Sequence, residues 1–467
     1  MRILLIQPGF GHGLGFQRVA LVEPLGLETV AATLLSERHK VKILDLRIEK
    51  KLEKCIKDFD PSLCGIGCSF TIDVYQTLRI AQAIKRLKKN AFVVVGGHHA
   101  SLSPADLNHP AVDAIVLGEG EETAMELAAA LEEGRDLQQV PGLALNQNGV
   151  QKMTGIREQL NKLDELPLPA RHILQKNARR YFMGFQRPLV MMETARGCPH
   201  HCEFCSVWRF FRGKCRTKSP ERVAEEMATL RAEFIIFVDD NFFLSIPRAQ
   251  KIAEILIAKN IKKRITVQVR SDAVVAHPDL ISLWTKAGLW KVFIGLEKVA
   301  DDELTSLGKR NSVRNNEEAL KILRAHNVEV CASFIVDPQY DRKDFARLRN
   351  YLRKWNLQFP SLTVLTPLPG TDLFQRLKEK LTTQNLELFD CAHAVLPTRL
   401  SLPEFYGEYS GLWKRGFLPT GMRWVDVVAF FRRLTTSPQL FIMLKSIWIM
   451  RDKGYFLAGH RVQPPYI

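Results

Sequence analysis

Short apolar runs alternate with amphipathic helical patterns twice along this chain, and this alternation limits its possible folds more than any other feature. In residues 1–135 five apolar runs predict strands, at Arg2–Ile6, Val41–Leu46, Leu63–Cys68, Phe92–Val95 and Ala114–Leu117. Near-continuous apolar strands separated by helices are typical of a parallel sheet that is covered on both faces. The first part of the chain is therefore predicted to be a doubly wound, Rossmann-like α/β domain.

Four of these predicted strands end in small or polar residues. The endings are Gln7-Pro8-Gly9, Ser69-Phe70-Thr71, Gly96-Gly97-His98 and Gly118-Glu119-Gly120-Glu121. In open α/β sheets, ligands bind outside the carboxyl ends of the strands. Four such endings in one domain predict a sizeable, flat cofactor lying over that edge of the sheet.

The alternation restarts at residue 188, after a connector punctuated by Pro141, Pro167 and Pro169. Six further strands are predicted, at Leu189–Thr194, Phe234–Val238, Ile265–Val269, Lys291–Gly295, Glu329–Val336 and Leu362–Leu365. One helix between them is expected to begin with Ser219 as its N-cap and to run through Ala232. Six βα units predict a partial (β/α)6 barrel of TIM type, with its chemistry on the loops after the strands.

Four parts are therefore expected: a Rossmann-like domain (1–140), a linker (141–187), a barrel (188–390) and a small, mainly helical region (391–467). The last region mixes aromatic with basic residues, and two helices are expected at about Trp424–Leu434 and Pro438–Met450. Such helices are typical of a peptide lying on a membrane surface. The alternative is a subdomain packed against the barrel, and the two are compatible if opposite faces serve the two roles.

The formal net charge of +16 is unevenly distributed. Residues 1–150 carry 16 Lys and Arg against 18 Asp and Glu, residues 151–390 carry 40 against 28, and residues 391–467 carry 10 against 4. A positive field favours a phospholipid surface, a nucleic acid or an acidic electron donor as partner. No run approaches the roughly 20 apolar residues of a membrane span, and the first residues do not resemble a signal peptide. A cytoplasmic protein is expected.

Three of the nine cysteines, Cys198, Cys202 and Cys205, fall within eight residues directly after the first barrel strand. A cubane iron–sulfur cluster normally takes four thiolates, so a local triplet leaves one iron open to another ligand. A structural zinc site needs four ligands, which His200 or His201 would have to complete from the same tight loop. The C-x3-C-x2-C spacing therefore favours a 4Fe–4S cluster, with zinc as the alternative.

This motif, its position after the first strand of a βα domain and Phe204 before the last cysteine resemble the radical S-adenosylmethionine (SAM) superfamily. The resemblance implies that SAM binds the open iron and is cleaved to a 5′-deoxyadenosyl radical. Abstraction of hydrogen from an unactivated C–H bond is beyond acid–base side chains, so the cofactor carries it. The resemblance also implies SAM contacts at the ends of the next three strands, at Asp239, Asp240, Arg270 and Glu297.

A doubly wound domain ahead of such a barrel resembles the cobalamin-dependent, B12-binding branch of this superfamily. The likeness implies cobalamin contacts on the strand-end loops, at Ser69, Thr71, Gly96, Gly97, His98, Gly118, Glu119 and Gly120. The Asp-x-His-x-x-Gly motif of a lower axial ligand has no counterpart at residues 7–13, where His12 is wrongly spaced. A lower axial histidine is therefore not expected, and a Rossmann-like domain without cobalamin is the alternative.

Further segments resemble the hopanoid C-3 methylases, over nearly the whole chain. They are residues 23–28, 206–208, 389–390, 393–400 and 402–406. The resemblance implies methylation of an unactivated ring carbon in a lipid-like substrate. The radical would abstract hydrogen, methylcobalamin would deliver the methyl group, and a second SAM would remethylate the cobalamin. A flavodoxin- or ferredoxin-type electron donor and peripheral contact with the inner face of a membrane are the other implied partners.

Three other functions compete with this interpretation. An enzyme of lipid cyclisation or C–C coupling would keep both cofactors without methylation. A tRNA methylthiotransferase would suit the positive charge, but Cys55, Cys64 and Cys68 are not spaced for its second cluster. A nucleic-acid-binding protein lacks a groove-reading motif here, so nucleic acid is not an expected partner.

Overall fold

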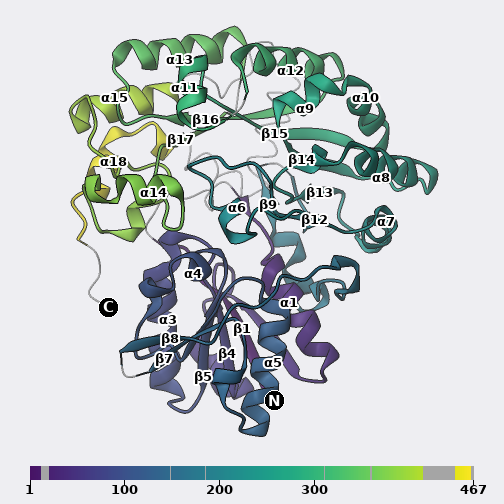
Figure 1. The fold of residues 1–467 in the computed structure, drawn as a ribbon, viewed down its shortest axis with the longest axis vertical. Helices are drawn as coiled ribbons and strands as arrows, with labels where there is room; N and C mark the ends of the chain where they lie inside the picture. Colours follow the sequence, from purple (N-terminus) through teal and green to yellow (C-terminus); the bar gives the residue numbers. More distant parts are fainter. Residues whose placement is uncertain are drawn as a thin grey trace.

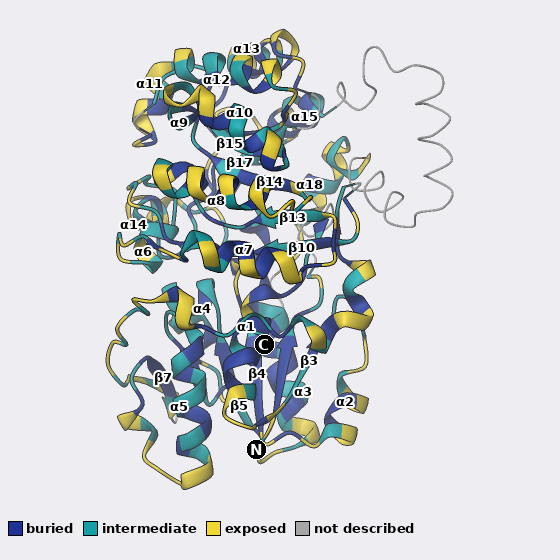
Figure 2. Ribbon diagram, turned by 90° about the vertical axis from the view of Figure 1, so that its right-hand side faces the viewer, coloured by how far each residue is buried: buried dark blue, intermediate teal, exposed yellow. Residues whose placement is uncertain are grey.

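The computed structural model describes residues 1–11, 20–147, 149–184, 186–309, 311–357, 360–413 and 448–463. Two α/β units make up most of the molecule (Figure 1), with the N-terminal sheet in purple and blue below the teal and green second unit. In both sheets most strand residues are buried or half-buried, apart from the exposed edge strand β8 (Val150–Met153), whereas exposed residues lie mainly on the helices and loops around them (Figure 2).

The first sheet has seven strands in the order β3-β1-β4-β5-β6-β7-β8. Their bounds are β1 (Arg2–Gln7), β3 (Lys40–Asp45), β4 (Leu63–Gly67), β5 (Phe92–Gly96), β6 (Ala114–Val116), β7 (Leu143–Gln147) and β8 (Val150–Met153). The first five strands pair in parallel, and β7 and β8 add an antiparallel edge. The parallel strands are the five that the sequence predicts, whereas β7 and β8 lie in the range expected as linker.

Helices cover both faces of this sheet, because successive side chains of a strand point to opposite sides. Ile3 and Leu5 of β1 pack toward α1 (Leu25–Ser36) and α5 (Gly120–Glu133). On the other face, residues of β1 and β4 pack with α2 (Leu52–Phe59) and α3 (Val74–Leu87). This is the predicted doubly wound arrangement.

The second sheet has six parallel strands that pair in chain order. They are β10 (Leu189–Met192), β13 (Phe234–Phe237), β14 (Arg264–Val269), β15 (Leu289–Glu297), β16 (Glu329–Val336) and β17 (Ser361–Val364). Because β10 and β17 do not pair with each other, the sheet is the predicted partial (β/α)6 barrel.

Helices surround the sheet of this barrel, and Trp284 is fully buried in the core that most of them share with the sheet. They are α7 (Pro220–Thr229), α8 (Ile246–Ala258), α9 (Ser271–Ala276), α10 (Pro278–Ala287), α11 (Asp301–Ser306), α12 (Val313–Ala325) and α13 (Arg342–Lys354). Ser219 caps α7 as expected, because its side chain accepts a 3.1 Å hydrogen bond from the N–H of Arg222. The helix ends at Thr229, three residues earlier than expected.

In the described part of the C-terminal region, α15 (Leu402–Leu412) and α18 (Lys453–Gly459) pack against each other. The rings of Tyr406 and Phe456 stack with their centroids 4.9 Å apart, and Phe405 meets Phe345 of α13. The helix expected at 424–434 lies outside the described residues, as does the one expected at 438–450 apart from its last three residues. None of the helices in the described ranges is long and apolar enough to cross a membrane.

The turn between α10 and β15 provides a test of the barrel. Gly288 has φ +110°, and an added Cβ would lie 2.2 Å from the carbonyl oxygen of Lys263. We expect Gly288→Ala to lower the free energy of unfolding by about 1–3 kcal/mol through backbone strain alone, and further through this clash. Gly134→Ala is the matched control, because Gly134 has φ +67° with open space around the added Cβ. Equal losses in urea unfolding would show that the Lys263 contact imposes no cost.

Candidate functional site

A short hairpin closes the loop that carries the three cysteines. Strand β11 (Ala195–Arg196) pairs antiparallel with β12 (Arg216–Thr217), and we call residues 197–215 between them the cluster loop. Gly197 has φ +91°, and an added Cβ would lie 2.1 Å from the carbonyl oxygen of Lys214. Only glycine fits at this position, because any side chain would collide with the returning strand of the loop.

The backbone around the last two cysteines is fixed by hydrogen bonds within the cluster loop. The N–H of Cys205 and the indole N–H of Trp208 both donate to the carbonyl oxygen of Cys202, at 3.1 and 3.2 Å. Trp208 belongs to the short helix α6 (Val207–Phe210) and stacks on His201, with ring centroids 4.5 Å apart. The aromatic pair therefore supports the turn that presents the cysteines.

The three cysteine side chains are neighbours. Burial raises the pKa of all three thiols, that of Cys205 to about 12, and the proximity of Cys202 and Cys198 contributes to the shift at Cys205. Within the described residues, no three Cys, His, Asp or Glu side chains are arranged to hold a single metal ion. Thiolates that each bind a different iron suit a 4Fe–4S cluster, and iron binding must then displace the thiol protons.

Asp239, expected among the cofactor contacts, has a carboxylate engaged with the strand before the cluster loop. It is 1% exposed and accepts hydrogen bonds from the N–H groups of Thr194 and Ala195 at 2.7 and 3.0 Å, and from the Thr194 hydroxyl. Asp240 follows it and accepts a hydrogen bond from the N–H of Gly197. Burial and the neighbouring Asp239 raise the pKa of Asp240 to about 7.

Charged side chains also lie near the cysteines at the ends of β14 and β15. Arg270 pairs with Asp272 at 2.8 Å. Its positive charge lowers the pKa of the Cys198 and Cys202 thiols, which partly offsets the rise caused by burial. Glu297 has φ +62° and pairs with Lys309, whose Nζ is 2.6 Å from Glu297 Oε1. The charge of Lys309 likewise lowers the pKa of the Cys202 thiol. The strand ends therefore present both signs of charge beside the cluster loop.

In the first domain, the loops after β4 and β5 approach each other closely. Gly97 has φ +126°, and an added Cβ would lie 2.7 Å from the carbonyl oxygen of Cys68. Thr71 is buried, and its hydroxyl lies 3.1 Å from Nδ1 of His99. Ser69 is exposed at the same edge. The glycine is thus required by backbone packing, and the exposed Ser69 is accessible to a ligand.

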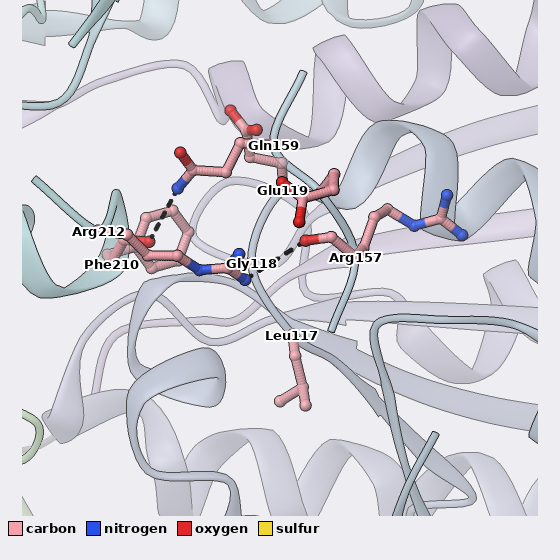
Figure 3. Close-up of a pocket in the computed structure, with 8 residues that line it drawn as sticks. Leu117, Gly118, Glu119, Arg157, Gln159, Phe210 and Arg212 are labelled. Carbon is pink, nitrogen blue, oxygen red and sulfur yellow. Dashed lines mark hydrogen bonds between the residues drawn. The ribbon is translucent and has the colours of Figure 1, made fainter. Parts of the chain in front are cut away.

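The loop after β6 meets the cluster loop around a small pocket (Figure 3). Its lining residues are Leu117, Gly118, Glu119, Arg157, Glu158, Gln159, Phe210 and Arg212. Gln159 donates to the carbonyl oxygen of Phe210 at 3.4 Å, and Arg212 donates to that of Arg157 at 3.3 Å. Gly118 has φ +82° with open space where a side chain would stand.

Side chains of the first domain bind the cluster-loop region directly. His98 Nε2 lies 2.7 Å from the hydroxyl oxygen of Ser206, and the imidazole stacks on Phe210. Burial lowers the pKa of His98 to about 4, so its ring is neutral at pH 7. Glu119, expected as a cofactor contact, pairs with Arg196 and Arg216, each at 2.7 Å.

Several residues of this region were not identified from the sequence. Arg196 directly precedes the cluster loop and Ser206 directly follows Cys205. Their positions beside the cysteine motif could therefore have indicated a role in this region. Their partners are 77 and 108 residues away, and no local pattern indicates such a pairing. Lys309 carried no signal, because a lysine after a helix is ordinarily solvated.

Two protein-family models match the chain. Residues 11–128 match the B12 binding domain, and residues 192–352 match the radical SAM superfamily. These matches support the fold expected from the sequence. They also identify cobalamin, a 4Fe–4S cluster and SAM as the cofactors, and the donor groups described above are compatible with them.

Three relatives are similar over most of their length. Hopanoid C-3 methylase of Methylococcus capsulatus is 33% identical over 87% of this chain and 78% of that protein. An uncharacterised methyltransferase of Pyrococcus horikoshii is 31% identical over 80% and 83%. Anaerobic magnesium-protoporphyrin IX monomethyl ester cyclase of Rubrivivax gelatinosus is 26% identical over 90% and 78%.

Two solved structures share the fold. The cobalamin-dependent SAM radical enzyme OxsB superimposes with a TM-score of 0.72 at 17% identity, over 99% of this chain and 75% of that chain. The radical SAM methyltransferase TsrM from Kitasatospora setae superimposes with a TM-score of 0.67 at 18% identity, over 82% and 76%. The likeness extends across both α/β units.

The buried carboxylate of Asp239 provides a test of how the cluster loop is held. Asp239→Ala leaves buried N–H donors of Thr194 and Ala195 without an acceptor, which costs about 1–3 kcal/mol for each group. We expect a lower free energy of unfolding and a lower iron content after reconstitution, measured by urea unfolding and iron assay. Asp279→Ala, at an exposed aspartate of α10, is the control. Unchanged iron content in Asp239→Ala would contradict a positioning role.

The neutral His98 should make stability depend on pH. Between pH 6.5 and about 4 the unfolded chain binds a proton at His98 that the folded chain does not, so stability falls as the pH falls. The loss from this group is about 1.4 kcal/mol per pH unit, or about 2 kcal/mol from pH 6.5 to 5. His98→Gln should lose correspondingly less stability over that range in urea unfolding of the cofactor-free chain. The exposed His172→Gln should behave as wild type, and an identical pH dependence in His98→Gln would refute the prediction.

Proposed function

This chain belongs to the cobalamin-dependent branch of the radical SAM superfamily, and on that premise we propose that it is a methyltransferase acting on a lipid-like substrate. The reaction is the addition of a methyl group to an unactivated carbon, and the first substrate to test is a hopanoid that would be methylated at C-3. Similarity to the hopanoid C-3 methylase over most of both chains supports this choice.

The main observation behind the proposal is that the carboxyl ends of the strands in the first sheet face those of the barrel strands. After β5, His98 contacts Ser206 of the cluster loop, and after β6, Glu119 pairs with Arg196 and Arg216 of the hairpin that closes this loop. Ligands of a doubly wound sheet lie outside the carboxyl ends of its strands, and those of a barrel lie on the loops after its strands. A substrate held between these edges is therefore within reach of both cofactors.

When bound, the cluster with SAM supplies a radical that removes hydrogen from a C–H bond, and cobalamin supplies the methyl group. The chain's own contribution is to hold and orient these groups. Asp240, Arg270 and the Glu297–Lys309 pair offer charges that suit the amino and carboxylate groups of SAM. Cys198, Cys202 and Cys205 bind the cluster.

Apolar side chains beside the cluster loop keep water away from the site. Phe204 of this loop packs with the buried Leu307, Ile335, Leu365 and Leu373. Leu373 lies in the first turn of α14 (Asp372–Leu377), and its N–H donates to the carbonyl oxygen of Glu203 at 3.0 Å. A dry, apolar wall protects a reactive radical and suits a lipid-like substrate.

The basic surface of the cluster loop favours an acidic electron donor, of flavodoxin or ferredoxin type, as the partner that binds there. Arg209, Arg212 and Lys214 are exposed on it. Basic side chains beside a redox centre steer an acidic protein toward it.

We further infer that the enzyme takes its substrate from the inner face of a membrane, because a polycyclic lipid partitions into the membrane rather than into water.

A cyclisation enzyme is the second candidate, because the chain is also similar to anaerobic magnesium-protoporphyrin IX monomethyl ester cyclases. Such an enzyme would use the same two cofactors without leaving a new methyl group on its product. The fate of the SAM methyl group therefore separates the two functions.

The test is an anaerobic reaction of the reconstituted full chain with SAM that carries a trideuteromethyl group. Diplopterol or a related hopanoid in mixed micelles is the acceptor, and titanium(III) citrate is the reductant. We expect a product that gains one trideuteromethyl group, with one 5′-deoxyadenosine and one S-adenosylhomocysteine formed per product. Mass spectrometry of lipids and nucleosides gives all three quantities.

Two cysteine variants serve as a matched pair for this test. Cys202→Ala removes a cluster ligand and is expected to abolish both nucleoside products, whereas Cys215→Ala changes a cysteine of the same loop outside the triplet. Deoxyadenosine formation by Cys202→Ala would overturn the cluster assignment. Deoxyadenosine formed by the wild type with the hopanoid, without S-adenosylhomocysteine or label transfer, would exclude the methyltransferase proposal and favour cyclisation.

A further inference from the structure

The first domain holds the cluster-loop region on both sides of the cysteine triplet. At the beginning, Glu119 and Glu121 bind Arg196, the residue before the loop. Near the other end of the cysteine triplet, His98 binds Ser206, the residue after Cys205. We call these the carboxylate tether and the histidine tether. Together they bracket the three cysteines, and both come from the segments that follow β5 and β6 of the first sheet.

The carboxylate tether is buried, and its opposite charges are paired. Arg196 is 6% exposed, and its guanidinium donates to Glu119 at 2.7 Å, to Glu121 at 2.6 Å and to Glu193 at 2.9 Å. Arg216, on the returning strand of the hairpin, donates to the second oxygen of Glu119. Removing one partner would leave a buried charge uncompensated, so these groups stay together at equilibrium.

The histidine tether is held on a rigid support. Gly97 packs against the backbone of Cys68, which fixes the position of the next residue, His98. The imidazole Nε2 lies 2.7 Å from Ser206 Oγ, and the ring stacks on Phe210 at 4.6 Å. A shift of the loop after β5 therefore moves the segment that follows Cys205.

We propose that these two tethers couple the cobalamin site to the cluster site, with Arg196 and Ser206 as positioning residues. Binding of cobalamin at the loops after β5 and β6 then orders the cluster loop, and assembly of the cluster orders those loops in return. The inference rests on the proposed function, because methyl transfer needs both cofactors in place at once.

The physical reason is shared ordering. Each cofactor restricts the loops that it touches, which costs conformational entropy, and loops already held through the tethers cost less to order a second time. Thermodynamic linkage makes the effect reciprocal, so each cofactor strengthens the binding of the other by the same factor. We call this factor the coupling factor.

The coupling factor can be measured on the full chain without any turnover. Hydroxocobalamin is titrated anaerobically into cluster-free and cluster-loaded protein, with binding followed by equilibrium dialysis. The ratio of the two dissociation constants is the coupling factor, which we expect to lie between about 5 and 150, the usual range for coupled sites. Cobalamin should also slow iron release from the cluster to a ferrous chelator.

Ser206→Ala removes one hydroxyl and no charge. We expect it to lower the coupling factor by about two- to tenfold, the contribution of one such hydrogen bond. The cobalamin affinity of the cluster-free chain should stay at the wild-type value. Arg196→Lys keeps the charge but loses the planar fork, and should lower the factor as well. A merely structural residue would change both affinities equally and leave their ratio unchanged.

Arg209→Gln is the matched control, because Arg209 lies on the same loop but pairs with Asp372 of the barrel. Its coupling factor should equal that of the wild type. Independent binding of both cofactors to the wild type, or an unchanged factor in both Ser206→Ala and Arg196→Lys, would overturn the coupling alone. Failure of the folded wild type to bind either cofactor would overturn the proposed function and the coupling with it.

Discussion

A single buried guanidinium organises the junction between the two α/β units. Arg196 lies among Glu119, Glu121 and Glu193, and Arg216 takes the remaining oxygen of Glu119. Charges removed from water must be compensated within hydrogen-bond distance, so the positions of all five groups are mutually constrained. Because Glu119 and Glu121 stand at the start of α5, just after β6 of one unit, and Arg196 directly precedes the cluster loop of the other, this constraint sets how the units face each other.

Two glycines allow the backbone segments at this junction to pack closely. Gly97 lets the loops after β4 and β5 touch, and Gly197 lets the cluster loop close on itself. Both have positive φ, and in both cases a Cβ would collide with a backbone carbonyl oxygen. These two residues determine the positions of the residues that follow them, His98 and Cys198.

The sequence allowed the elements to be predicted and indicated three cysteines as candidate cluster ligands, but it did not reveal the contacts of several polar residues. All five parallel strands of the first sheet and all six of the barrel follow from apolar periodicity. Asp239 and Glu119 were expected to contact cofactors, and the structure shows their carboxylates bonded to Thr194 and to Arg196. A carboxylate at a strand end serves a ligand or a neighbouring loop equally well, and sequence alone does not distinguish the two.

The sequence by itself determined the two α/β units and the C-x3-C-x2-C triplet, because strand burial and ligand spacing are written within a few adjacent residues. Only the tertiary structure decided that both ends of the cysteine triplet are bound by the other domain. His98 and Ser206 are 108 residues apart, and Glu121 and Arg196 are 75 apart. Partners at such separations are selected when two apolar cores and their strand ends pack together, because an unpaired buried charge or donor would cost several kcal/mol.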